Sequence, residues 1–393
     1  MQQSKVRPSF FASALADEGA RNVAYQVFAA VAIGTALFFF TANTVENLTR
    51  LGIASGFGFL GGMAGYDVSE GFIAHSSRST VGWIFLVGLL NTLYISSIGI
   101  VLATILGVLI GIARVSPNWI MAKLSAAYIE LFRNTPMLLQ IAFWYALVRQ
   151  LPLPRQAFNP TPGIFLSNRG LVHPLPVFDS SHGWMLGSCA LAFIAFLAFW
   201  RWAARRRTAS GKRMSLLGPA GLAILIPIAT GWYTGSGQVG WNIPTLRGFN
   251  FQGGTTHSPE FVALLTGLVT YIAAFIGEIV RAGIQAVSIG QREAARSLGI
   301  REGDILRYVT LPQALRVIVP PLTSQYLNLV KDSSLAVWIG YPDLVSVANT
   351  AINQTGQALE NIFIMMVVYL SVSLSISAFM NWYNRKVALK GTR

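Results

Sequence analysis

Charged side chains within otherwise apolar stretches are the residues best placed for chemistry. Glu130 and Arg133 lie three positions apart, and Glu278 and Arg281 repeat this spacing further along the chain. Residues three apart share one face of a helix, so each carboxylate can pair with its guanidinium. Because ionised groups are costly in an apolar environment, each pair predicts either a contact for a polar solute or a structural ion pair that anchors a helix end.

A second polar cluster occupies positions 331–334, directly after an apolar segment. A zwitterionic solute carries one carboxylate and one ammonium group, which the Lys331 ammonium and the Asp332 carboxylate match in a partly dry cavity. In the alternative interpretation, these two residues neutralise each other at a membrane interface. The candidate solute path comprises Glu130, Arg133, Asn134, Thr135, Lys331, Asp332, Ser333 and Ser334.

The basic loop at 288–312 predicts a short helix that ends at a glycine. Ser288 and Gln291 have the spacing of a capping box, in which a serine and a glutamine satisfy the first amide groups of a helix. Gly299 stands where a helix C-terminus favours a residue in the left-handed conformation.

A second short helix is expected in the same loop. Asp304 is a suitable N-cap for it, and the helix would run toward Val309. Pro312 predicts the point at which the chain turns to enter the next apolar segment.

The elements that position these residues are apolar helices. The chain has 393 residues, of which 53% are hydrophobic and only 11% charged, against about 25% charged in a soluble domain. Several apolar stretches approach the roughly 20 residues that cross a bilayer as a helix. The sequence therefore predicts an all-α polytopic membrane protein. Its eight expected spans are 24–42, 81–115, 124–148, 184–200, 216–232, 259–279, 317–330 and 362–382.

Small residues recur every four positions in the second span, at Gly99, Ala103, Gly107 and Gly111. They form one face of a helix, and such a face permits close approach of another helix. We expect tight packing there and assign it no chemistry.

Basic residues predict the orientation of the spans. Of the 29 Lys and Arg residues, 21 fall in segments that would lie inside, 7 in segments outside, and Arg133 within a span. Lys and Arg are retained on the cytoplasmic side, so both termini are expected in the cytoplasm. This topology also explains the net charge of +14 without a nucleic-acid partner.

The spans and the loops between them divide the chain into six segments. Six prolines between Gln150 and Gly183 favour an irregular external loop, and Cys189 is expected to be a small buried hydrophobe. The predicted segments are a cytoplasmic start (1–23), a first helix with external loop (24–80), a pair of spans (81–149), an external loop with two further spans (150–258), the last three spans with the basic loop (259–384) and a cytoplasmic tail (385–393).

The basic loop carries a resemblance to a known family. Its glutamate and two alanines, a glycine four positions on, and a closing Val-x-Leu-Pro resemble the EAA loop of ABC-importer permeases, with Val309 in place of the usual isoleucine. In that family the loop forms coupling helices that dock in a cleft of a cytoplasmic ATPase. The resemblance implies ATPase coupling by Glu293, Ala294, Ala295, Gly299, Leu311 and Pro312.

Three further segments, 88–93, 128–137 and 331–335, resemble the polar amino-acid class of these permeases. The match covers about 81–382 apart from 150–258, so the resemblance implies a permease core in two parts, 81–149 and 259–384, divided by a two-helix insertion. An extra first helix and this insertion resemble permease subunits of general L-amino-acid transporters and their glutamate/aspartate relatives. This resemblance implies a type I ABC-importer permease core in the inner membrane. It also implies four partners: an ABC ATPase, a homologous second permease subunit, a periplasmic amino-acid-binding protein and the lipid bilayer.

Catalytic motifs are absent from the sequence. A phosphate-binding loop would need a glycine where Arg206 precedes Gly211 and Lys212. No His-Glu-x-x-His motif, Cys/His cluster or Gly-x-Ser-x-Gly elbow occurs. We therefore expect no catalytic residue, metal or cofactor on this chain, with ATP and Mg²⁺ bound by the partner ATPase.

Two other classes of membrane protein stay open. A secondary transporter driven by an ion gradient would bind its coupling ion at Glu130, Glu278 or Asp332. A channel or passive scaffold would not need a capped, glycine-broken loop on the cytoplasmic side.

Overall fold

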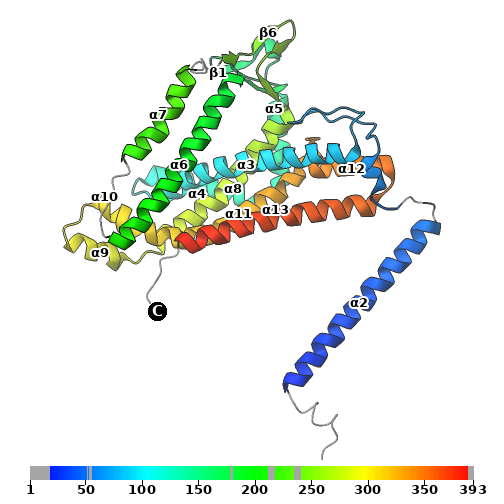
Figure 1. The fold of residues 1–393 in the computed structure, drawn as a ribbon, viewed down its shortest axis with the longest axis horizontal. Coiled ribbons are helices and arrows are strands. Elements are labelled where there is room, and N and C mark those ends of the chain that lie inside the picture. The colour runs from blue at the N-terminus through cyan, green and yellow to red at the C-terminus, as the bar shows by residue number, and fades with distance from the viewer. Residues whose placement is uncertain are drawn as a thin grey trace, which may run out of the picture.

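A computed structural model describes residues 18–50, 52, 55–177, 180–210, 217–233 and 240–387 (Figure 1). Most of the predicted cytoplasmic start and part of the predicted tail lie outside these residues. The helices are α2 (Glu18–Arg50), α3 (Val81–Arg114), α4 (Trp119–Asn134), α5 (Met137–Arg149), α6 (Ser180–Ser210), α7 (Leu217–Tyr233), α8 (Pro259–Gln285), α9 (Ile289–Ser297), α10 (Glu302–Ile305), α11 (Leu311–Asp332), α12 (Leu344–Thr355) and α13 (Ala358–Val387).

Five of the described helices are long and apolar enough to span a membrane: α2, α3, α6, α8 and α13. The expected spans at 216–232 and 317–330 correspond to the shorter apolar helix α7 and to α11. The helix α12, which follows the 3₁₀ turn η4 (Ser333–Trp338), was not predicted. Its 12 residues are too few to cross the hydrocarbon, so no long apolar run marks it.

The helix α8 forms the centre of the bundle and packs against α3, α4, α5 and α11. In contrast, α2 projects away from the bundle (Figure 1), and its membrane-length segment has no buried residues. The core around α8 consists of aliphatic side chains that exclude solvent almost completely. It includes Ile95, Ile141, Leu264, Leu268, Ile272, Ile276 and Leu329.

The small residues of α3 form a close-packing face, as predicted: Gly107 and Gly111 lie against α8, and Gly99 lies against Leu329 of α11. Gly99, Ala103, Gly107 and Gly111 are all buried. A Cβ atom added to Gly107 would lie 2.6 Å from the Ile276 side chain and 2.9 Å from the backbone oxygen of Ala273. The two helix backbones approach too closely for a side chain at this crossing.

The predicted span at 124–148 is wrong as a single helix. The helix α4 ends at Asn134, and α5 starts at Met137 after an extended Thr135 with φ −103° and ψ 130°. Pro136 causes the break because its ring disfavours a helical conformation at the preceding residue and its nitrogen has no hydrogen to donate.

Gln140 repairs the backbone at this break. Its side-chain amide donates to the carbonyl oxygens of Phe132 (2.9 Å) and Thr135 (3.0 Å), which the interrupted helix leaves without a helical donor. The residue is buried in the α5 face that packs on α8. Sequence analysis missed this role, although a glutamine four residues after a helix-breaking proline was visible.

We predict that Gln140→Leu destabilises the protein. The substitution keeps the size of the side chain but leaves two carbonyl groups without a donor, at about 1–3 kcal/mol for an unsatisfied buried group. Thermal unfolding in detergent measures this loss. Gln354→Leu, on an exposed position of α12, is the control and should unfold as the native protein does. Equal melting temperatures for the two variants would contradict the role of Gln140.

The predicted irregular loop after Gln150 is also wrong, because this region and the segment before α8 form short strands. Strands β1, β2, β3 and β8 form an antiparallel sheet in that order, and β4–β5 and β6–β7 each form a two-stranded antiparallel ribbon. The strands are β1 (Phe158–Thr161), β2 (Ile164–Ser167), β3 (Gly170–His173), β4 (Leu175–Val177), β5 (Gly240–Asn242), β6 (Thr245–Arg247), β7 (Asn250–Gln252) and β8 (Thr255–His257).

Edge positions explain why the prolines permit these strands. Pro160 lies in β1, at the edge of its sheet, and Pro176 lies in β4, whose ribbon has only edges. A proline without an amide hydrogen is tolerated on an edge strand. Pairing of β3 with β8 joins the two ends of the insertion, so α6 and α7 extend side by side from a β-stranded base (Figure 1).

Cys189 is exposed on α6, which corrects the prediction of a buried side chain. The helix α6 makes its main contacts with α7, so much of its surface has no protein neighbour. A small apolar residue therefore need not be in the core of a membrane protein.

Candidate coupling loop and polar face of α8

The coupling loop is defined here as residues 288–312. Its first helix, α9, ends in a Schellman motif: the amide of Ile300 donates to the Ala295 carbonyl (3.2 Å) and that of Gly299 to the Arg296 carbonyl (2.9 Å). Gly299 has φ +72°, the left-handed conformation that glycine adopts without steric cost. The predicted glycine-terminated helix is confirmed.

Two details of the predicted capping are wrong. Ser288 is the N-cap residue of α9, but its side chain makes no capping hydrogen bond. The second helix starts at Glu302 with Arg301 as N-cap, so Asp304 lies inside α10 rather than before it. The carboxylates of Glu302 and Asp304 therefore both lie in the first turn of α10, where the helix dipole favours negative charge.

An ion pair between Arg296 and Glu302 connects the two short helices across Gly299. The hydrogen bond from Arg296 lowers the pKa of the Glu302 carboxyl, and the same bond raises the pKa of the guanidinium. The pair is exposed to solvent, where such interactions contribute little to stability. Its effect is to orient α9 relative to α10.

The predicted turn at Pro312 is wrong, because the chain continues as a helix into α11. A π-helical turn, η3 (Leu306–Thr310), lies between α10 and α11, and the amide of Leu311 donates to the Leu306 carbonyl five residues back. Proline cannot donate to the preceding turn and its ring crowds the carbonyl four residues earlier. The wider π turn accommodates both constraints without ending the helix.

The loop is attached on one side and exposed on the other. Ala295 is only 5% exposed and Ile305 only 1%, whereas Leu298 is 78% exposed. Glu293, Ala294 and Gly299 are also exposed. Leu311 is exposed and Pro312 half-buried at the start of α11. The loop therefore exposes an apolar residue and charged groups, while two of its side chains are buried.

The predicted pair at the end of α8 is confirmed. The Arg281 Nε atom donates to the Glu278 carboxylate at 2.9 Å, and the guanidinium also bonds to Gln285. Arg114 and Arg133 lie close enough to interact electrostatically with the same carboxylate. Glu278 thus pairs with Arg281 of α8 and lies near basic side chains of α3 and α4.

The alternative of an ion pair between Glu130 and Arg133 is wrong within the described structure. No ion pair within 4.0 Å joins these two described residues, and the Arg133 guanidinium lies over the Phe275 ring, 5.2 Å from its centre. Neighbouring Asn134 is exposed, and the Thr135 hydroxyl donates to the Leu131 carbonyl at 2.7 Å. The Arg133 guanidinium therefore contacts α8 instead of pairing with Glu130 of its own helix, α4.

The second polar cluster is divided by the end of α11. Asp332 lies close enough to Tyr271 of α8 to interact electrostatically with its hydroxyl. The hydroxyl groups of Ser333 and Ser334 donate to backbone carbonyls three residues back, at 2.8 and 2.6 Å. Lys331 and Ser334 instead line a cavity of about 340 Å³ on the side of α13.

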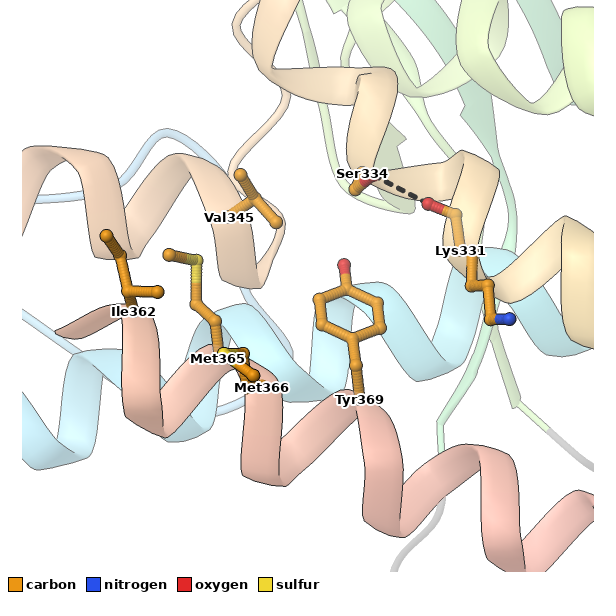
Figure 2. A pocket seen from close by; sticks show the side chains of 7 residues that line it. All are labelled: Lys331, Ser334, Val345, Ile362, Met365, Met366 and Tyr369. Atoms are coloured by element: carbon orange, nitrogen blue, oxygen red, sulfur yellow. Dashed lines mark hydrogen bonds between the residues drawn. The ribbon is translucent and has the colours of Figure 1, made fainter. Parts of the chain in front are cut away.

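Figure 2 shows this cavity, with Tyr369 of α13 pointing toward Ser334 and Met365 pointing toward Val345. The side chains that line the cavity are mainly apolar, and the charged group among them is the Lys331 ammonium. No described carboxylate lies within 4.0 Å of the Lys331 ammonium, but Lys331 lies close enough to Asp332 to interact electrostatically with its carboxylate. The alternative in which these two residues neutralise each other therefore stays a prediction.

Two of the candidate solute-path residues, Asp332 and Arg133, lie beside the same face of α8. Tyr271, Phe275 and Glu278 follow a helical spacing of four and three and are all half-buried. Asp332 approaches this face at Tyr271, and Arg133 approaches it at Phe275 and Glu278. We call Tyr271, Phe275 and Glu278 the polar face of α8. Sequence analysis missed Tyr271 and Phe275 because aromatic residues in a span are ordinary.

The chain belongs to the family of inner-membrane components of binding-protein-dependent transport systems, whose family model matches residues 99–389. Its fold is that of a type I ABC-importer permease. Within this family the chain is 49% identical over 368 residues to the putative amino-acid ABC transporter permease protein YhdX of Escherichia coli K12, covering 93% of each chain.

Two further relatives align with nearly the whole chain. The chain is 44% identical to the general L-amino acid transport system permease protein AapQ of Rhizobium johnstonii, over 96% of this chain and 95% of the relative. It is 39% identical to the glutamate/glutamine/aspartate/asparagine transport system permease protein BztB of Rhodobacter capsulatus, over 94% of each. The resemblance noted in the sequence is thereby confirmed over nearly the whole chain.

Proposed function

We propose that this chain is the permease subunit of an ATP-driven importer that carries L-amino acids across the inner membrane. Family membership and three relatives named for amino-acid transport support this proposal. The observation that carries the ATP-driven part is the exposed, glycine-terminated coupling loop with its buried anchors Ala295 and Ile305. Such a loop suits docking of a separate ATPase, and both termini would share its cytoplasmic side.

The proposed cycle follows from two arrangements of one bundle. ATP binding closes a pair of ATPase subunits, which draws together the coupling loops of this chain and a homologous second permease. The cavity between the permeases then opens outward to receive an amino acid from a periplasmic binding protein, and hydrolysis resets it. ATP and Mg²⁺ belong to the ATPase, and this chain contributes no catalytic group. Within the described residues no group of three His, Cys, Asp or Glu side chains could hold a metal.

Uptake in energised vesicles tests this function against an ion-driven transporter. Depletion of internal ATP should abolish amino-acid uptake, and an uncoupler at constant ATP should not. Co-purification with an ATPase from detergent is the second measurement. Loss of uptake with the uncoupler alone would favour ion coupling at Glu130, Glu278 or Asp332 and overturn the proposal.

We further propose that the polar face of α8, with Asp332 and Arg133 beside it, lines the solute path. A zwitterionic amino acid has an ammonium group that Asp332 attracts and a carboxylate that Arg133 attracts. Asn134 and Thr135, at the break before α5, lie next to Arg133 in the chain. Lys331, Ser333 and Ser334 extend the path toward α13 in this proposal, with Ser334 and Lys331 lining the adjoining cavity.

Asp332→Asn should lower uptake at limiting amino-acid concentration by about tenfold. A lost hydrogen bond to a charged group costs about 1.5–3 kcal/mol, and about 1.4 kcal/mol corresponds to a factor of ten. Asp67→Asn makes the same chemical change in an exposed external segment and serves as the control. Unchanged affinity and rate for Asp332→Asn would remove this residue from the path.

A further inference from the structure

The short strands of the insertion stand at one end of α8, and the coupling loop stands at the other. Strand β8 ends at His257, and the next residue, Ser258, is the N-cap of α8. The coupling loop follows the opposite end of the same helix. Because α8 is long and apolar enough to span a membrane, the strands and the coupling loop lie on opposite sides of it. A protein docked on the coupling loop therefore cannot reach the strands.

The ribbon β6–β7 carries an exposed tip made of two arginines and a phenylalanine. The Arg155 guanidinium lies over the Phe249 ring, 4.2 Å from its centre, and the Arg155 Nε atom donates to the Gly248 carbonyl at 3.3 Å. Arg247, the last residue of β6, is exposed, and Phe249 is 72% exposed. We call Arg155, Arg247 and Phe249 the ribbon tip.

The ribbon tip is attached to α8 through packed rings and paired strands. The Phe251 ring of β7 stacks on the Phe165 ring of β2, with 4.4 Å between their centres. Strand β2 pairs with β3, and β3 pairs with β8. In β8 the buried His257 ring has its Nδ1 atom 2.9 Å from the Glu70 carboxylate, which also accepts from the Ser258 amide. The tip is thus an ordered surface, and an ordered surface loses little entropy when a partner binds.

The positive charge of this surface has no acidic counterpart beside it. The sequence contains no Asp or Glu at 150–177 or at 240–257, but it contains Arg155, Arg169 and Arg247 there. All three arginines are exposed. Within the described residues, no carboxylate lies within 4.0 Å of any of their guanidinium groups. An acidic partner surface would supply the missing charge.

Two kinds of partner can reach this side of the membrane, a binding protein and the lipid headgroups. The family to which the chain belongs depends on a binding protein. That protein must deliver its solute on the side away from the ATPase. Figure 1 shows β6 beyond the ends of α6 and α7, so the ribbon projects past the helices that meet the lipid. Arginine beside an exposed aromatic ring is also the composition typical of a protein interface.

We propose that the ribbon tip is a docking surface for an acidic face of the amino-acid-binding protein. The inference rests on the proposed function, because it takes the coupling loop as the side of the ATPase. Strand β8 connects this surface directly to α8, whose polar face lines the proposed solute path. The binding protein would therefore dock on an element that is continuous with the path it supplies.

Uptake by the complete transporter in proteoliposomes tests the docking surface, with ATP inside and purified binding protein at increasing concentrations outside. Arg247→Glu should raise the half-saturating concentration of binding protein by about tenfold, because it sets like charges against each other. Maximal uptake at saturating binding protein should equal that of the native protein. Added salt should raise the half-saturating concentration more for the native protein than for the variant, since it screens the attraction that the variant lacks.

Two further variants separate the ribbon tip from the general charge of this side. Phe249→Ala should also raise the half-saturating concentration, because it removes an aromatic anchor without changing the charge. Arg78→Glu is the matched control. Arg78 is exposed and lies outside the ribbon tip, in the segment that Glu70 joins to the same end of α8. This control should change the half-saturating concentration by less than about twofold.

Three results would overturn the inference while leaving native ATP-dependent uptake, and with it the proposed function, intact. The first is an unchanged half-saturating concentration in both ribbon-tip variants, and the second is an equal effect of Arg78→Glu and Arg247→Glu. The third is a loss in Arg247→Glu that persists at saturating binding protein and depends on phosphatidylglycerol in the liposomes, which would assign the tip to lipid headgroups. Absence of ATP-dependent uptake by the native protein would instead contradict the proposed function together with this inference.

Discussion

Gly299→Val should uncouple the chain from its ATPase, with amino-acid uptake and ATPase co-purification both falling by about tenfold. A residue with a Cβ atom in the left-handed conformation costs about 1–2 kcal/mol, and a β-branched residue is a marked outlier there. Nothing lies within 4 Å of a Cβ atom added to Gly299, so the cost is conformational and not steric. The Schellman motif and the angle between α9 and α10 would both change.

Gly303→Val is the matched control for this experiment. Gly303 lies four residues further on, in α10, with no positive φ angle and open space around an added Cβ atom. This variant should transport as the native protein does. Uptake by Gly299→Asn should lie between that of Gly299→Val and that of Gly303→Val, because asparagine tolerates the left-handed conformation better than valine. Full uptake by Gly299→Val, or equal loss in both valine variants, would show that the glycine is not the element that couples the loop.

Gly107→Ala should destabilise the whole bundle, lowering its melting temperature in detergent by several degrees. The added methyl group would lie 2.6 Å from Ile276 and 2.9 Å from the Ala273 backbone oxygen. Backbone cannot move as a side-chain end can, so α3 and α8 must separate. Overpacking of this kind typically costs 1–3 kcal/mol, and α8 contacts most of the core.

Gly34→Ala and Gly99→Ala provide the comparison. Gly34, in α2, has nothing within 4 Å of an added Cβ atom and should tolerate alanine. At Gly99 the nearest atoms belong to the Leu329 side chain, at 3.3 Å, and this flexible neighbour should make the effect small. A melting temperature for Gly107→Ala equal to that of Gly34→Ala would contradict the close helix crossing.

In the coupling loop, the local sequence predicted some features of the structure and missed others. A glycine after a short amphipathic segment predicted both the helix end and the positive φ of Gly299, because few other residues adopt that conformation. The start of α10 and the π turn before Pro312 were not predicted. Several helical arrangements satisfy the same proline, and the choice depends on how α11 meets the bundle.

The insertion shows where composition misleads. Six prolines favoured an irregular loop between Gln150 and Gly183, yet Pro160 and Pro176 lie in edge strands. Whether a strand is an edge or a centre depends on its partners, and β3 pairs with β8, more than eighty residues away in the sequence. A short-range pattern does not contain that information.

The sequence by itself determined the membrane class of this protein, most of its apolar helices, the close-packing face of α3 and the position of the glycine that ends α9. These properties depend on hydrophobicity, helical spacing and the steric freedom of single residues. Only the tertiary structure decided that Arg133 faces Phe275 and Glu278 rather than Glu130, and that Gln140 repairs the break at Pro136. Such pairings depend on which helices pack together, because a long polar side chain bonds to whichever partner the packing brings within its reach.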